Sequence, residues 1–527
     1  MIPVLWADLI IVNANIHTVS SGRAQALAVS DGKIVATGQN EEIRKLAGPK
    51  TKIEDLGGKT VLPGFIDAHM HLVSVGLRES GYYLDLSQAR SLNEALELVR
   101  QRVQKTEKAQ WVLGRGWDES RWPERRYITR ADLDKIAPEH PVALIRICGH
   151  ILCANSLALQ KISVTPRAGE FDESLGLLRE ETAWAFLQKL QPSDEQIRAA
   201  IVAGAKLAHR LGVTAIHDIS KPEHVRAYMS LLGPSPMAFS LLRGGAGGEV
   251  SMSEGLQLRV RLNIEVQHLE HLMALGLRTN FGNEFLKLGA IKLFADGSIG
   301  ARNAALSKRY HDSDSFGKLN YEQSELNRLV KHAHDHSFQV MIHAIGDRAI
   351  DAALEALAYA GATPAHRHRI EHAELLSDSQ IARMKGLGII ASMQPNFVQW
   401  SGPGGLYETR LGPERDAQID PHRKVLDAGV KLAFGSDGMP FGPLYGIHCA
   451  VNAPHPNQRV SVEEAIRAYT LDAAYAAFEE HSLGSLEPGK LADFVVLSED
   501  PAHAKNIKEI RVERTYLAGR CVFEYDN

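Results

Sequence analysis

The sequence has few cysteines, no long hydrophobic run and almost no excess charge. Four cysteines in 527 residues include no CxxC pair, so we expect free thiols in a reducing compartment, without a disulfide framework. No apolar run reaches the ~18 residues that a membrane span requires. The first residues also lack a basic segment ahead of an apolar one, as a signal peptide would have. We therefore expect a cytoplasmic protein with no membrane partner.

The small net charge excludes further classes of partner. The chain carries 59 basic and 63 acidic side chains, a net charge of -4, which gives no reason to expect nucleic acid or an anionic surface as partner. Hydrophobic residues make up 44% and charged residues 23%, as in an ordinary globular protein. A small molecule is the expected ligand, and the sequence leaves open whether the chain forms a homo-oligomer.

Short apolar runs near both chain ends predict a small β-domain. The expected strands lie at residues 9–12, 26–29, 33–37, 491–497 and 514–523. Asp31 and Gly32 separate two of these runs, and an Asp-Gly pair favours a hairpin because both residues tolerate the positive φ of its turn. We predict a β-sandwich made from residues 1–58 and 483–527.

Between these ends, an alternation of short strands and helices predicts an α/β fold, a (β/α)8 TIM-like barrel. One strand ends at His69, and seven more are expected to end near His217-Asp218, residues 263–265, Lys292, His343, His372, Gln394 and Asp437. Eight parallel strands close such a barrel, and its chemistry lies at the C-terminal strand ends. The barrel should span residues 59–482, with an insertion at about residues 75–195.

The insertion follows the first barrel strand and is rich in tryptophan and charged residues. We expect it to cap the barrel mouth, where Trp117 and Asp118 would line a substrate pocket. The competing interpretation is that these tryptophans pack in a core, as most do in large proteins. His217 and Gln394, at barrel strand ends, are further candidates for substrate contact.

The clearest chemical motif lies where the first barrel strand ends. Residues 61–71 read VLPGFIDAHMH, and alternate side chains of a strand share a face, so His69 and His71 would converge on one metal ion. Later strand ends add Lys292, His343, His372 and Asp437. Neutral imidazoles and a carboxylate suit zinc or a similar divalent ion.

On these motifs the chain resembles the amidohydrolase superfamily, and within it the amidohydrolase-3 branch of N-substituted formamide deformylase-like enzymes. The matching segments cover nearly the whole chain, at residues 63–71, 292–298, 343–347, 371–373, 435–437 and 484–493. The resemblance implies a metal-dependent hydrolase on the predicted barrel.

The resemblance also implies a two-metal site. Its ligands would be His69 and His71 on one ion, His343 and His372 on the other, and Lys292, carboxylated by carbon dioxide, between them. Asp437 would touch the first metal and the attacking water. A one-metal site with an unmodified Lys292 stays open, because carboxylation cannot be read from a sequence.

The expected reaction is hydrolysis of a non-peptide C–N amide-type bond by metal-activated hydroxide. A metal ion lowers the pKa of bound water from 15.7 toward about 7, and Asp437 is the expected general acid and base. A hydrolytic deaminase or an esterase on the same barrel is an alternative. Deaminases of this superfamily typically carry His-x-x-Glu on the fifth strand, where residues 343–346 read HAIG. A non-catalytic metal-binding scaffold is the other alternative, and the complete ligand set argues against it.

Overall fold

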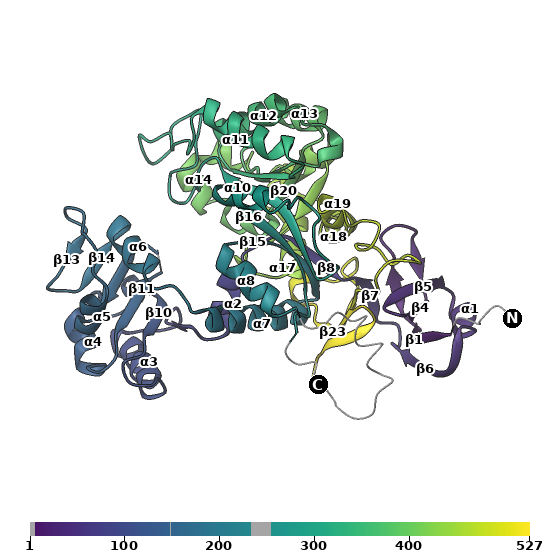
Figure 1. Cartoon of the computed structure of the whole chain (residues 1–527), viewed down its shortest axis with the longest axis horizontal. Helices are drawn as coiled ribbons and strands as arrows, with labels where there is room; N and C mark the ends of the chain where they lie inside the picture. The colour runs from purple at the N-terminus through teal and green to yellow at the C-terminus, as the bar shows by residue number, and fades with distance from the viewer. Residues whose placement is uncertain (1–5, 148, 233–254, 527) are drawn as a thin grey trace. The chain divides into compact units, whose positions relative to one another are not determined.

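The computed structural model describes residues 6–147, 149–232 and 255–526. The chain divides into two compact units, of which the smaller runs from Val73 to Gly204. The larger unit is made of two segments, one up to Leu72 and one from Ala205 on. In Figure 1 the first segment is purple and the second runs from teal to yellow. No helix in the described ranges is both long enough and apolar enough to cross a membrane.

Eight parallel strands of the larger unit form a nearly closed barrel. Their order is β8 (Phe65–Met70), β15 (Val213–Ser220), β16 (Arg259–Glu265), β17 (Leu286–Phe294), β18 (Val340–Ala344), β19 (Arg369–His372), β20 (Ile390–Met393) and β21 (Leu432–Phe434). Each strand pairs in parallel with its neighbour in this list. The predicted (β/α)8 barrel is confirmed.

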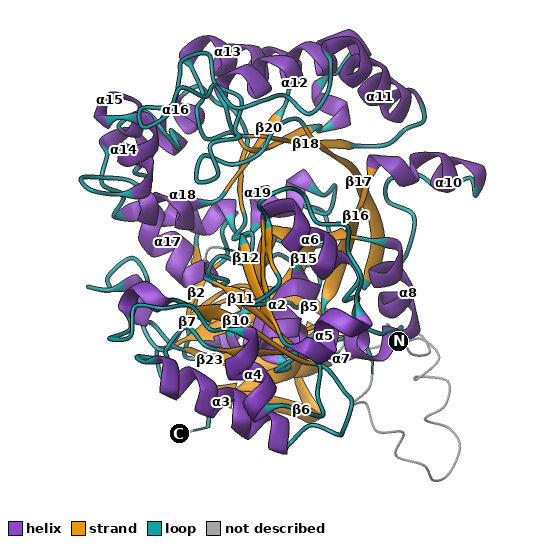
Figure 2. Ribbon diagram, turned by 90° about the vertical axis from the view of Figure 1, so that its left-hand side faces the viewer, coloured by secondary structure: helices purple, strands orange, loops and turns teal. Residues whose placement is uncertain are grey.

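Helices between the strands cover the outside of the barrel, as α11 (Gln323–Asp335), α12 (Asp347–Ala360) and α13 (Asp378–Leu387) show in Figure 2. Helix α12 is rich in alanine, a strong helix former, and ends at Gly361, whose φ of 85° is a left-handed cap. The other described α-helices of this unit are α1 (Asn40–Arg44), α8 (Pro222–Ser230), α10 (Leu269–Ala274), α14 (Leu406–Leu411), α15 (Pro413–Asp416), α16 (His422–Asp427), α17 (Pro443–Val451), α18 (Val462–Ala468) and α19 (Leu471–Ala476). Helix α7 (Asp194–Arg210) begins in the smaller unit and ends in the larger one.

The seam between the last and first barrel strands is held by residues just beyond β21. The Asp437 N–H donates to the carbonyl of His69 at 2.8 Å. The Ser436 N–H and hydroxyl both donate to the carboxylate of Asp67, at 3.0 and 2.5 Å. A Cβ on Gly435 would lie 2.3 Å from the backbone nitrogen of His69. The strands can approach this closely only because residue 435 is glycine.

Strands from both chain ends form two further sheets, and these confirm the predicted strands. The first sheet has the order β5 (Lys33–Gly38), β4 (Ala26–Ser30), β1 (Ala7–Val12) and β6 (Ala47–Asp55). The second sheet has the order β24 (Arg520–Glu524), β23 (Val512–Leu517), β22 (Phe494–Leu497), β7 (Thr60–Pro63), β2 (Asn15–His17) and β3 (Arg23–Ala24). Leu9 and Leu27 of the first sheet share a core with Val61 and Phe494 of the second. The domain boundaries at residues 58 and 483 stay predictions.

The predicted hairpin at Asp31 and Gly32 is present. Strands β4 and β5 pair antiparallel on either side of it, and the two turn residues have φ of 50° and 73°. These are the positive values that a tight turn of this kind requires.

The smaller unit has its own sheet and core. The sheet has the order β13 (Phe171–Asp172), β14 (Leu177–Arg179), β12 (Ile151–Ala154), β11 (Val142–Arg146), β10 (Val112–Trp117) and β9 (Tyr83–Asp85). Its α-helices are α2 (Leu72–Glu79), α3 (Leu92–Gln104), α4 (Arg130–Ile136), α5 (Ser156–Lys161) and α6 (Glu180–Gln188). Trp117 and Trp122 are buried in this core and stack with ring centroids 6.1 Å apart. Cys148 lies outside the described residues, and the described cysteines, Cys153, Cys449 and Cys521, are free thiols.

Candidate metal centre

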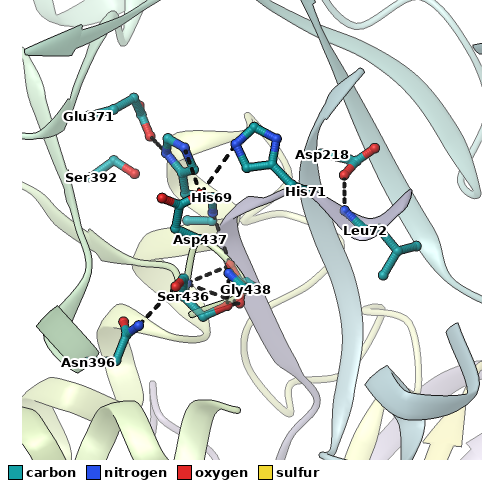
Figure 3. Close-up of polar contacts among 12 residues, drawn as sticks. His69, His71, Leu72, Asp218, Glu371, Ser392, Asn396, Ser436, Asp437 and Gly438 are labelled. Carbon is teal, nitrogen blue, oxygen red and sulfur yellow. Dashed lines mark hydrogen bonds and ion pairs between the residues drawn. The ribbon is translucent and has the colours of Figure 1, made fainter. Parts of the chain in front are cut away.

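Side chains from the C-terminal ends of β8, β19 and β21 converge in the barrel mouth. His69, His372 and Asp437 each offer one ligand atom, and these three atoms lie within 4.8 Å of one another. His71 adjoins the group, with its Nε2 3.3 Å from Asp437 Oδ1, and Figure 3 shows both histidines directed at this carboxylate. Two imidazoles and a carboxylate are ligands that suit a divalent ion such as zinc.

His343 on β18 continues this row of rings. Its centroid lies 4.5 Å from that of His372, which lies 4.8 Å from that of His69. The Nε2 of His343 is 3.0 Å from the Gly297 carbonyl, to which it can only donate. In the neutral ring this leaves Nδ1 as the nitrogen with a free lone pair.

Lys292 is fully buried on β17, and its Nζ has no hydrogen-bond partner among the described residues. Burial lowers its pKa to about 8, although Glu371 and Asp437 act in the opposite direction. The Nδ1 of His372 is likewise buried without a partner in the described ranges. Because an unpaired buried polar atom is costly, these two atoms fit a site that binds a further group, such as a metal ion.

The backbone is strained at two of the predicted ligands. His372 has φ of 67° and Asp437 has φ of 55°, and the following Ala373 has φ of 51°. Such conformations cost about 1–3 kcal/mol each in residues other than glycine and cluster at functional sites. On β19 the side chains of Arg369 and Glu371 face the barrel interior, so regular alternation would point His372 outward. The left-handed turn breaks this alternation, and the His372 ring lies beside that of His69.

The histidines of this centre are neutral at neutral pH. Burial, and then the charge of Lys292, lower the pKa of His69 well below its usual value. The same two causes lower the pKa of His343 to about 3. Burial, followed by His343, also lowers the pKa of His372 well below its usual value. Neutral imidazoles present the lone pair that a metal ion requires.

Two charged residues behind the centre were missed by the sequence interpretation. Glu371 Oε2 lies 2.5 Å from His69 Nδ1, and the guanidinium of Arg369 binds both oxygens of Glu371 at 2.8 and 2.9 Å. Arg369 also lies 2.9 Å from His217 Nδ1. All four side chains are buried. The sequence does contain a signal for them, because two charged residues at alternate positions of a short apolar strand are unusual. A charged residue inside an apolar strand is also what made Lys292 a candidate.

The four residues predicted to contact substrate lie in different surroundings. His217 is fully buried in the network just described. Gln394 is buried, and neither its amide oxygen nor its amide nitrogen has a partner in the described residues. In the smaller unit, Trp117 donates from Nε1 to the Leu144 carbonyl at 3.1 Å, and Asp118 caps a short 3-10 helix. Contact with substrate stays a prediction for all four.

A second group of histidines, His334, His366 and His368, also brings three ring nitrogens together. The Val340 N–H donates to His368 Nδ1 at 2.9 Å, and the Thr363 N–H donates to His366 Nδ1 at 3.1 Å. In a neutral ring the proton then lies on Nε2, which is no longer free to bind a metal. His368 Nε2 instead lies 2.9 Å from His334 Nδ1, so these two rings are hydrogen-bonded to each other.

Comparison with known proteins gives consistent matches over nearly the full length. The model of the amidohydrolase family matches residues 52–523. The chain is 30% identical to Bacillus subtilis YtcJ, over 95% of this chain and 96% of that one. It is also 30% identical to the N-substituted formamide deformylase of Arthrobacter pascens, over 98% of each. An uncharacterized metal-dependent hydrolase from Pyrococcus furiosus superposes with a TM-score of 0.78 at 30% identity, covering 94% of this chain and 99% of that one.

Proposed function

The chain belongs to the amidohydrolase family and is a hydrolase, and from this premise we propose that it cleaves a non-peptide C–N amide-type bond of a small molecule. The observation that carries the proposal is the convergence of His69, His372 and Asp437 at the C-terminal ends of three barrel strands. One relative at 30% identity is named for removing a formyl group from N-substituted formamides, which contain such a bond.

The donor set and the unpartnered buried atoms support a divalent metal ion here, and we propose zinc. In the two-metal form, His69 and His71 would hold one ion, His343 and His372 would hold the other, and Lys292 would contribute a carbamate as a further anionic ligand. Because the pKa of Lys292 is about 8, a fraction of the molecules carries this side chain as a neutral amine near pH 7.5. The amine nitrogen attacks carbon dioxide and releases one proton, which leaves an anionic carbamate. An unmodified Lys292 with one ion beside Asp437 is the alternative.

A divalent ion bound by these residues would lower the pKa of a bound water from 15.7 toward about 7. Asp437 is partly exposed at the barrel mouth, and its Oδ1 lies 3.3 Å from His71 Nε2. Its carboxylate would take the proton of the attacking water and return it to the leaving nitrogen, a transfer that contributes about a hundredfold or more. The amide of Gln394, which has no partner among the residues described, would donate to the substrate carbonyl.

The test compares wild type with Asp437→Asn. We expect the variant to retain its metal, measured by elemental analysis, and to lose turnover by about a hundredfold or more. The substrate panel contains N-acyl amino acids, formamides, cyclic amides, esters and aminated heterocycles. Normal turnover by the metal-loaded variant would overturn the role of Asp437. Turnover of esters alone, or release of ammonia alone, would replace the amide proposal, and a folded protein that binds no metal would favour the scaffold.

A further inference from the structure

We propose that the buried ion pair of Arg369 and Glu371 holds His69 in the tautomer with its proton on Nδ1, and thereby sets the metal affinity of the centre. Both residues are positioning residues, because they act through His69. The tautomer follows from contacts within the chain, whereas the effect on metal affinity rests on the proposed function.

The first step is the contact between Glu371 and His69. Glu371 Oε2 lies 2.5 Å from His69 Nδ1, and both side chains are almost completely buried, so water does not compete. An ionised carboxylate can only accept a hydrogen bond, so the proton lies on Nδ1. The Nε2 of the neutral ring then carries the lone pair, and it faces Asp437 Oδ1 at 3.9 Å.

The second step is the charge of Glu371. A carboxylate without water requires a cation and well-directed donors. Arg369 provides both, with Nε on one oxygen at 2.8 Å and Nη2 on the other at 2.9 Å. This bidentate geometry also fixes the direction of the oxygen that accepts from His69.

The third step is that Arg369 is itself held from several strands. Its Nη1 donates to His217 Nδ1 on β15, and its Nη2 donates to the Ser392 hydroxyl on β20 at 2.8 Å. Nη2 also donates to the carbonyl of Ala68 at 2.6 Å. Because Ala68 precedes His69, one guanidinium restrains both the backbone and, through Glu371, the ring of this predicted ligand. Such outer partners typically change metal affinity by about 10–100-fold when removed.

A second buried pair in the same unit provides the matched control. Arg259 binds both oxygens of Asp493 at 2.6 and 3.0 Å, and both side chains are buried. Arg259 begins β16, at the strand end opposite to the one that carries the metal centre. Asp493→Asn therefore disturbs an ion pair of the same type without touching His69.

The experiment compares wild type with Glu371→Gln, the double variant Arg369→Met with Glu371→Gln, and Asp493→Asn. Glu371→Gln leaves Arg369 without a counter-charge, and the double variant removes both charges so that folding is kept. Competition with a zinc chelator measures metal affinity. Nuclear magnetic resonance of metal-free protein labelled with 15N in its histidine rings reports the tautomer, and His69→Gln assigns the signal.

We expect a protonated Nδ1 at His69 in wild type and in Asp493→Asn, and loss of that signal in both Glu371 variants. Zinc affinity should fall about 10–100-fold in these two and stay within about twofold in Asp493→Asn. A proton on Nε2 of His69 in wild type, unchanged affinity in both Glu371 variants, or an equal loss in Asp493→Asn would overturn the inference. A wild type that binds no zinc but has its proton on Nδ1 supports the tautomer and overturns the proposed function.

Discussion

Replacing Gly435 by alanine tests whether the barrel seam depends on close contact between its two strands. The new Cβ would lie 2.3 Å from the backbone nitrogen of His69 and 2.9 Å from its Cα. These are backbone atoms, so no side-chain rotation relieves the overlap. Overpacking a well-packed site costs about 1–3 kcal/mol. We expect the upper end of this range, because moving the strands apart also stretches the bond from Asp437 N–H to His69, worth about 1 kcal/mol.

The assay is urea unfolding, with metal content measured on the same samples. Gly386→Ala is the control, because Gly386 lies exposed in helix α13 and a Cβ there meets nothing within 4 Å. This control should gain about 0.5–1 kcal/mol, the usual effect of replacing a helical glycine by alanine. Gly435→Ala should instead lose about 3 kcal/mol and bind less metal. Equal stability and metal content of Gly435→Ala and wild type, with the control behaving as expected, would refute the reasoning about the seam.

Two predictions concern metal removal and pH. Chelation should lower the midpoint of thermal unfolding and added zinc should restore it, since an ion at a hundredfold excess over its Kd stabilises the fold by about 2.7 kcal/mol; an unchanged midpoint after complete metal removal would contradict this. Arg302 and then Arg410 lower the pKa of Asp312 to about 2, so this carboxylate stabilises the fold above its unfolded pKa of 3.8 and loses that effect as pH falls through about 2. Asp312→Asn should be less stable than wild type at pH 7, and this difference should shrink as the pH falls toward 2; a constant difference in urea unfolding at the two pH values would contradict the assignment.

The barrel could be predicted because its strands carry strong local patterns. The run from Phe65 ends in His69 and His71, and the later strands also end in polar residues after short apolar runs. The hairpin at Asp31 and Gly32 could be predicted for a similar reason, since its turn residues must tolerate positive φ. These features depend on neighbours in the sequence, which a single sequence displays.

The contacts that support the metal centre could not be predicted in this way, even where a local pattern marks the residues that make them. Arg369 and Glu371 act on His69 from a strand far away in the chain, and their pairing exists only once the barrel has closed. The left-handed backbone at His372 was also hidden, because positive φ is uncommon in residues other than glycine and tertiary contacts must impose it. Trp117 is a further example. Its size and hydrophobicity fit both a pocket lining and a packed core, and only the structure shows that the ring is buried in a core.

The sheet shared by the two chain ends has a consequence for how the protein is made. Val61 on β7 pairs with Val496 on β22, so β7 obtains this neighbour only after the whole barrel between them has been synthesised. At about 5–20 residues per second, the ribosome delivers that neighbour about 20–90 s later. During this time the edge of β7 is open to other chains, as the edges of unpaired strands are. A nascent chain stalled before Phe494 would keep that edge, and we expect such products to be aggregated or degraded, whereas a chain that includes β22 can cover it.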